Sequence, residues 1–235
     1  MTTKTRTTTK SNVQPAPDRL VPISLEAEAP LDCPLRPRLV AYREANDAAH
    51  PDWFNAPVPS FGDAKARLLI VGLAPGMHGA NRSGRPFTGD HAGILLYETL
   101  HRHGFADRPK SVSARDGLKL KNCRITNAVK CLPPANKPLP AEIATCNLYL
   151  QTELAKLAPG SVLLALGTVA HDAALQAFKL KRKDYKFAHA SYHKLPNGLH
   201  LLDSYHCSRY NTQTRRLTAE MFDQILHQAR KLLSD

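Results

Sequence analysis

The sequence predicts an α/β protein with a central, mostly parallel four-stranded sheet and helices on both faces. Two observations indicate this class: short apolar runs rich in β-branched residues recur along the chain, and amphipathic helical patterns separate them. Strands that alternate with helices usually form parallel sheets that are covered on both faces. In such sheets, ligands bind beyond the carboxyl ends of the strands.

Four segments have the short, apolar character of buried strands. The first follows a proline-punctuated loop and ends at Gly72, and the third ends at Gly167. We expect strands at residues 67–71, 123–129, 162–166 and 199–203.

Helical patterns lie between and around these strands. Pro140 suits a first helical position, and Thr218 with Glu220 supplies a cap and a negative charge at a helix start. Pro34 and Pro37 delay the start of the first helix. We expect helices at residues 31–46, 93–103, 140–157, 168–178 and 218–233.

The 235 residues, 43% of them hydrophobic, are enough for one packed domain, which we expect over residues 26–235. Residues 1–25 are rich in Thr, Lys and Pro, and we expect a disordered basic arm there. No apolar run approaches the ~20 residues of a membrane span, and no hydrophobic stretch follows the basic start as in a secretory signal. The sequence therefore predicts no membrane association.

The formal net charge of +12 favours a polyanionic partner, although ribosomal and membrane-surface proteins are also basic. Five cysteines are too few for a disulfide framework in a chain of this size, so reduced thiols or metal ligands are expected. We expect a monomeric, cytoplasmic protein.

A glycine-rich segment follows the first strand and runs from Gly72-Leu73-Ala74-Pro75 to Asn81-Arg82-Ser83-Gly84-Arg85-Pro86-Phe87-Thr88-Gly89-Asp90. It lacks the spacing of a nucleotide P-loop or a dinucleotide-binding loop. It resembles the first motif of the family 5 uracil-DNA glycosylases, in which each of these positions is matched.

Two further segments extend this resemblance. Thr126-Asn127 leading to Lys130-Cys131 resembles the middle motif of the family, and residues 204–218 look like its last motif. The likeness runs from about Leu31 to the C-terminal helix. It implies a three-layer α/β/α glycosylase that excises uracil, and other deaminated or damaged bases, from DNA.

Such an enzyme must extrude its target nucleotide from the duplex into a pocket. Phe87 would stack on the flipped base, and the Asn127 amide suits the Watson–Crick edge of uracil, with an acceptor for N3–H and a donor for O4. The residues expected to surround the base are Gly72, Leu73, Ala74, Phe87 and Asn127.

Asp90 and His206 are the candidate catalytic residues. His206 can donate a hydrogen bond to uracil O2 as negative charge develops on the leaving base. Asp90 can stabilise the cationic sugar and activate water. Other branches of the superfamily place a polar catalytic residue where this chain has Leu73. By themselves, Asp90 could be only a helix cap, Asn127 could close a turn, and His206 could be structural.

The remaining motif residues are expected to contact DNA. Arg209, Tyr210 and Asn211 would wedge into the space that the base vacates. The family usually has glycine where this chain has Arg215. Phosphate or other DNA contacts are expected from Asn81, Arg82, Arg85, Ser208, Thr212, Thr214, Arg215 and Arg216.

Members of the family usually hold a [4Fe-4S] cluster through four cysteines. Here the first pair is reduced to Cys33-Pro34-Leu35-Arg36, because an arginine occupies the second ligand position. A guanidinium is no iron ligand. We expect no cofactor; the alternative is a labile cluster on Cys33, Cys131 and Cys146.

A rival hypothesis is a binding module that recognises damaged or abasic DNA without cleaving it. It would keep the wedge residues and Asn127, whereas Asp90 and His206 favour the enzyme. No lysine is marked out for a Schiff base, so we expect a monofunctional glycosylase that uses water.

Overall fold

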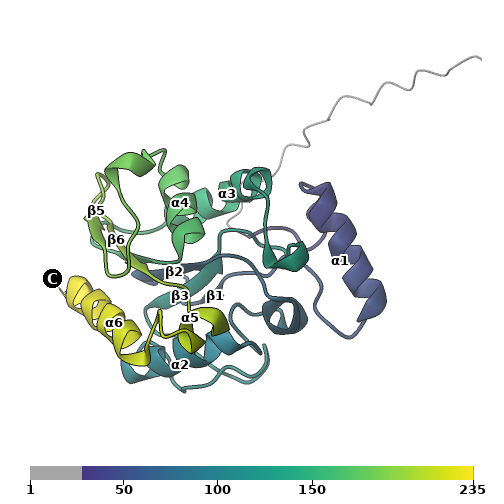
Figure 1. The fold of residues 1–235 in the computed structure, drawn as a ribbon, viewed down its shortest axis with the longest axis horizontal. Coiled ribbons are helices and arrows are strands. Elements are labelled where there is room, and N and C mark those ends of the chain that lie inside the picture. The colour runs from purple at the N-terminus through teal and green to yellow at the C-terminus, as the bar shows by residue number, and fades with distance from the viewer. Residues whose placement is uncertain (1–27, 235) are drawn as a thin grey trace, which may run out of the picture.

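A six-stranded sheet between two helical layers forms the centre of the protein in a computed structural model that describes residues 28–234 (Figure 1). The strands are β1 (Phe61–Gly62), β2 (Leu68–Gly72), β3 (Cys123–Asn127), β4 (Val162–Leu166), β5 (Tyr192–Lys194) and β6 (His200–Ser204). The helices are α1 (Pro37–Ala49), α2 (His91–Arg102), α3 (Pro140–Leu154), α4 (Thr168–Ala177), α5 (Arg209–Gln213) and α6 (Ala219–Ser234). Short helical turns lie at Met77–Asn81, Pro134–Asn136 and Arg182–Asp184.

The sheet has the order β1-β3-β2-β4-β6-β5. Its four central strands are parallel, and the short edge strands β1 and β5 run antiparallel to β3 and β6. In register, Gly72 pairs with Asn127, and Leu166 pairs with Ser204. The carboxyl ends of the four parallel strands therefore meet at one edge of the sheet.

Side chains of the central strands alternate between two cores, as expected for strands buried on both faces. Leu68 and Ile70 of β2 face one core, which α2 and α6 cover. Leu69 and Val71 face the other, which α3 and α4 cover. Figure 1 shows these helix pairs on opposite sides of the sheet, with α1 beyond its β1 edge.

The predicted fold class is confirmed, with small differences. The four expected strands are the parallel ones, but β1 and β5, of two and three residues, were not predicted. All five expected helices are present; α1 begins only at Pro37, and the five-residue α5 was not predicted.

Residues 1–25, for which a disordered arm was expected, lie outside the described residues, so the division of the chain into an arm and one domain stays a prediction. Within residues 28–234, no helix is long and apolar enough to cross a bilayer.

Candidate active site

A cavity of about 400 Å³ opens at the carboxyl edge of the sheet. Phe87, Asp90, Asn127 and His206, which come from three separate segments of the chain, all contribute to its wall. Leu73, Ala74, Gly76, Ala80, Ala92, Asn136 and Ser208 complete the lining. The four side chains expected to surround one base therefore share a single cavity.

The floor of this cavity continues the pairing of β2 and β3 beyond the strands. The amides of Ala128 and Val129 donate to the carbonyls of Gly72 and Leu73, at 2.9 and 3.0 Å. These bonds fix the backbone on which Asn127 is mounted.

The Asn127 side chain has an unused acceptor. The residue is only 3% exposed, and within the described chain its buried Oδ1 has no hydrogen-bond partner. An unsatisfied buried acceptor costs about 1–3 kcal/mol. A ligand that brings an N–H group to this oxygen removes that cost.

Phe87 forms the aromatic wall and has a left-handed backbone, with φ of 53°. Gly93 of α2 allows this turn, since a Cβ atom at Gly93 would lie 1.8 Å from the Phe87 carbonyl oxygen. The Phe87 ring centroid is 5.8 Å from that of His206. The turn thus places an aromatic face next to the imidazole.

Asp90 is both the N-cap of α2 and a wall residue of the cavity. Its Oδ1 accepts a hydrogen bond from the Gly93 amide at 3.0 Å. Burial raises the pKa of Asp90, while the amides of Gly93 and Ala92 oppose the shift. The capping and the catalytic interpretations of Asp90 are therefore compatible.

His206 lies on the segment between β6 and α5. Burial lowers its pKa to about 4, so the imidazole is neutral at physiological pH. The Asn211 side chain donates to the His206 carbonyl at 2.8 Å and ties this segment to α5. A neutral imidazole still carries one N–H group that can donate into the cavity.

The segment after His206 carries the expected wedge and phosphate residues. Tyr210 is 70% exposed, and Arg209, Thr214, Arg215 and Arg216 are also exposed. Ser208 caps α5, and Asn211 is partly buried through its bond to His206. Arg215 adopts φ of 56°, so the loop keeps a left-handed residue where the family usually has glycine.

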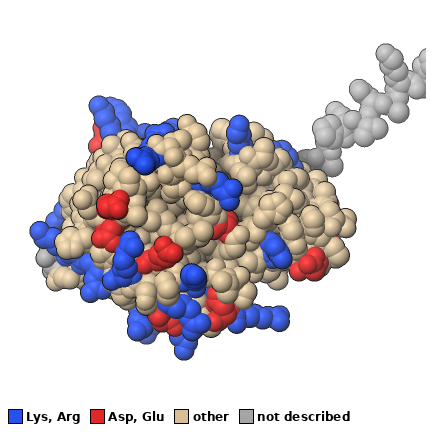
Figure 2. Space-filling view, turned by 60° about the horizontal axis from the view of Figure 1, so that its bottom comes forward, with Lys and Arg blue, Asp and Glu red and all other residues tan. Residues whose placement is uncertain are grey.

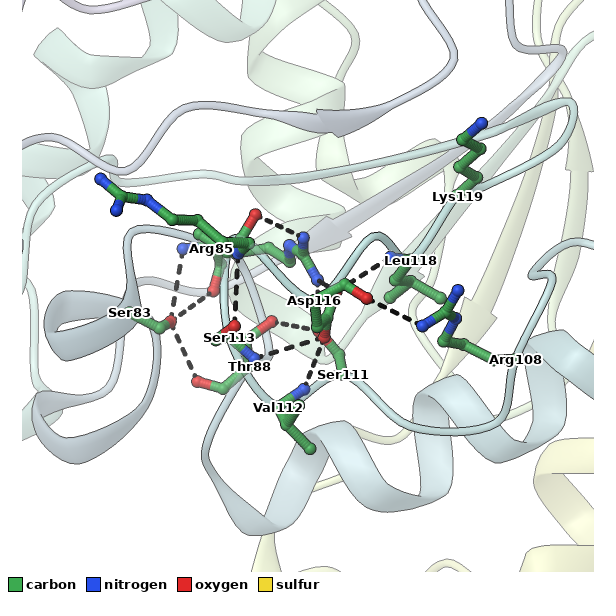
Figure 3. Close-up of polar contacts among 12 residues, drawn as sticks. Ser83, Arg85, Thr88, Arg108, Ser111, Val112, Ser113, Asp116, Leu118 and Lys119 are labelled. Atoms are coloured by element: carbon green, nitrogen blue, oxygen red, sulfur yellow. Dashed lines mark hydrogen bonds and ion pairs between the residues drawn. The ribbon is translucent and has the colours of Figure 1, made fainter.

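Arg82 is exposed, but two other first-motif residues expected to contact DNA are buried. Arg85 is 5% exposed, and its guanidinium pairs with Asp116 at 2.7 Å and donates to the Ala114 carbonyl at 2.8 Å (Figure 3). Asn81 is 2% exposed, and its Nδ2 donates to Oδ1 of Asn55 at 2.9 Å. Both side chains are bound to protein partners, and the expectation of DNA contacts is corrected for them.

Asn136 also lines the cavity and was missed by the sequence analysis. It has φ of 55° in the turn that follows Pro133 and Pro134. The two prolines indicate a turn but give no sign of the direction in which it points.

The residues that would hold an iron–sulfur cluster do not form a four-thiolate set. Cys33, Cys131 and Cys146 are buried, and the Cys33 thiol lies 3.3 Å from the Tyr149 hydroxyl. Nε and Nη2 of Arg36 are buried and have no partner among residues 28–234. No group of three or more His, Cys, Asp or Glu side chains in that range is placed to hold a metal ion. Three thiols beside a cationic donor do not fit a [4Fe-4S] cluster.

Comparison with known proteins identifies the family. The family model "Uracil DNA glycosylase superfamily" matches residues 59–230. The chain belongs to the uracil-DNA glycosylase superfamily. The match includes the wall residues Phe87, Asp90, Asn127 and His206, whereas Cys33 and Arg36 lie before it.

Several curated members of the superfamily are similar over most of their length. A "Type-5 uracil-DNA glycosylase" of Thermus thermophilus is 47% identical over 206 residues, which cover 85% of this chain and 93% of that protein. Proteins of the same name from Mycobacterium bovis and Pyrobaculum aerophilum are 42% and 38% identical, over 85% of this chain and 78% and 88% of their own.

Proposed function

We propose that this superfamily member excises uracil from DNA by hydrolysing its N-glycosidic bond, as a monofunctional glycosylase in base excision repair. The observation that carries the proposal is the convergence of Phe87, Asp90, Asn127 and His206 around one cavity of about 400 Å³. The type-5 names of its relatives support uracil as the substrate. The proposal extends to other deaminated or damaged bases.

Recognition of the flipped base follows from the cavity wall. The base stacks on Phe87, and its N3–H donates to the unpaired Oδ1 of Asn127 while the amide donates to O4. Cytosine has an acceptor at N3 and an amino group at position 4. Its N3 would face the acceptor Oδ1, and its amino group would face the amide donor, so neither hydrogen bond could form. Leu73 and Ala74 shape the floor against which the base rests, while Gly72 lies behind the lining, against the Asn127 and Phe87 side chains.

Bond cleavage separates positive charge on the sugar from negative charge on the leaving base. As the C1′–N1 bond breaks, its electron pair leaves with uracil, and a neutral His206 donates a hydrogen bond to O2. The Asp90 carboxylate stabilises the cationic sugar and accepts a proton from the water that bonds to C1′. The uracil anion then takes up one proton, equivalent to the one that Asp90 removed from water, and the products are free uracil and an abasic site.

An excision assay tests these roles on strands that each carry one modified base. Asp90→Ala and His206→Ala should each lower the single-turnover rate on uracil by roughly 100-fold or more. The exposed residues Asp47 and His227 give matched controls, Asp47→Ala and His227→Ala, which should retain full activity. Wild-type protein that binds uracil-containing DNA without releasing base would instead indicate a non-catalytic binding module.

We also propose that the protein functions without an iron–sulfur cluster. The support is Arg36, which stands at the sequence position where the family usually has a second cysteine ligand, and whose Nε and Nη2 atoms are buried without a partner among the described residues. Purified wild-type protein should contain no stoichiometric iron or sulfide and show no visible absorption. Arg36→Cys supplies a fourth thiolate and should gain both after anaerobic reconstitution. Stoichiometric iron in the wild type would contradict this proposal and favour a labile cluster on three cysteines.

We further propose that the protein acts as a monomer in the cytoplasm. Five unpaired, buried cysteines fit a reducing compartment. Sedimentation of the purified protein at several concentrations tests the monomer.

A further inference from the structure

A second hollow lies next to the base cavity and shares Asp90 with it. It consists of two grooves of about 610 and 470 Å³, which adjoin at Gly89 and Val112, because these two residues line both. The larger groove also includes Asp90, which is part of the base-cavity wall. A polynucleotide that lies along both grooves would therefore pass the Asp90 carboxylate.

Cationic side chains occur in both halves of this groove. Lys110 and Arg209 line the half that contains Asp90, and Arg82 and Arg115 line the other. Lys110, Arg82 and Arg115 have no ion pair within residues 28–234. The carboxylates of the groove are Asp90, Glu98 and Asp52, so four cations face three carboxylates.

The cations are local rather than part of one large basic face. In Figure 2, which brings forward the side of the molecule at the bottom of Figure 1, Lys and Arg side chains are spread over the surface with Asp and Glu between them. Binding of a polyanion to this side therefore depends on where individual cations lie.

Arg82 is held at the groove by aromatic packing. Its guanidinium carbon lies 5.8 Å from the Trp53 ring centroid, and the His50 ring stacks on Trp53 at 3.9 Å. The edge of Trp53 also meets His78, which lines the same half of the groove. Such packing orients the guanidinium without neutralising its charge.

Lys110 and Arg115 belong to one anchored loop, residues 107–119 between α2 and β3. A β-bridge between Ala106 and Leu120 closes its base.

Within the loop, Asp116 accepts hydrogen bonds from Arg85 and from the amides of Val112, Ser113 and Leu118 (Figure 3). The loop is thereby fixed against the glycine-rich segment, and it presents Val112, 69% exposed, where the two grooves meet.

We propose that loop 107–119 and Arg82 form a track for the DNA strand that carries the extruded nucleotide, with Lys110 bound to a phosphate in the half that contains Asp90 and Arg115 bound to a phosphate in the other half. This inference rests on the proposed function for the identity of the strand. The phosphodiester chain matches the charge of the groove, and its base can enter the adjoining cavity through the shared residue Asp90.

The salt dependence of DNA binding tests the track. Each lost phosphate contact lowers the steepness of log K against log salt by about 0.9. Lys110→Ala/Arg115→Ala should therefore reduce the slope by about 2 and weaken binding of a uracil-containing duplex roughly 10-fold or more at ~0.1 M salt. With inactive Asp90→Ala as the common background, binding is measured by fluorescence anisotropy without turnover.

A matched control removes the same charge from the opposite edge of the sheet. Lys65 and Lys156 border a hollow near the amino ends of β2 and β4. Lys65→Ala/Lys156→Ala should leave the slope nearly unchanged. Equal slopes for the two double variants would overturn the proposal.

Trp53 supplies a direct probe, because it is the only tryptophan of the chain. Saturating duplex DNA should change its emission, and Arg82→Ala should reduce that change. Unchanged emission with bound DNA would exclude the Arg82 half of the track. Both readouts measure binding alone, so a protein that fails to excise uracil can still pass or fail them.

Discussion

Two glycines determine how closely side chains approach the base cavity. A Cβ atom at Gly72 would lie 2.4 Å from Oδ1 of Asn127 and 2.7 Å from Cζ of Phe87. A Cβ atom at Gly79 would lie 2.5 Å from Oδ2 of Asp90. Glycine at these positions leaves room for three side chains of the cavity wall, Asn127, Phe87 and Asp90.

Gly72→Ala should reduce uracil excision on the order of 100-fold, because a shift of about 1 Å in catalytic geometry can cost that much. Asn127 and Phe87 must both move to accept the methyl group. The exposed Asp47→Ala variant is again the control and should retain full activity. Single-turnover rates and circular dichroism separate a site defect from unfolding. Equal activity in the two variants would contradict the cavity geometry.

The pH dependence of excision should follow the ionisation of Asp90. Its pKa is raised by burial, and only the ionised form stabilises the sugar cation. Activity should therefore fall, as pH decreases, at values above the ordinary aspartate range. His206, with a pKa of about 4, stays neutral through most of this range. Single-turnover pH profiles of wild type and Asp90→Asn test this, and an acidic limb that survives in the variant would refute the assignment.

At the scale of elements, the buried ion pair of Arg85 and Asp116 secures loop 107–119. Arg85→Ala should lower the free energy of unfolding by about 1.5–3 kcal/mol, because Asp116 loses its charged partner and keeps only backbone amide donors. The exposed Arg82 is the control, and Arg82→Ala should change the free energy of unfolding by less than about 1 kcal/mol. Urea denaturation measures both. Similar losses would show that the pair does not stabilise the loop.

The same pair makes stability depend on pH. Partial burial opposes the ionisation of Asp116, but the Leu118 amide and the Arg85 guanidinium hold its pKa well below the usual value of 3.8. A lowered folded-state pKa stabilises the protein above the unfolded value, and this contribution is lost as pH falls further. Asp116→Asn should therefore flatten the acid limb of a stability–pH curve.

The sequence predicted those helices and strands whose apolar residues form a recognisable pattern. Strands β2 and β4 are continuous apolar runs, and the core helices follow from the helical spacing of their apolar residues. Strands β1 and β5 have no such period, since they are short edge segments defined by their pairing partners. Helix α5 spans only five residues, which is too short for a periodic signal.

Motif residues were easier to find than their orientations. The motifs named Phe87, Asp90, Asn127 and His206, and these side chains share one cavity. The same first motif gave no sign that Arg85 points inward, because its partner Asp116 lies 31 residues away in an unremarkable loop. Long-range pairing of this kind is decided by tertiary packing.

At the scale of the whole molecule, folding should not depend on iron. Prolonged treatment with an iron chelator should leave the unfolding temperature unchanged, because a protein without a cluster, as proposed, has no bound iron to lose. Differential scanning calorimetry with and without chelator measures this. A chelator-dependent fall in the unfolding temperature would show that a bound metal contributes to stability.

The hydrogen bonds from Ala128 and Val129 to Gly72 and Leu73 join the cavity floor to the centre of the sheet. Their amide protons should exchange with deuterated solvent as slowly as those of β3, since both require the same cooperative opening. The cavity floor is then rigid before any DNA binds. The conformational change that extrudes a nucleotide must therefore occur mainly in the DNA.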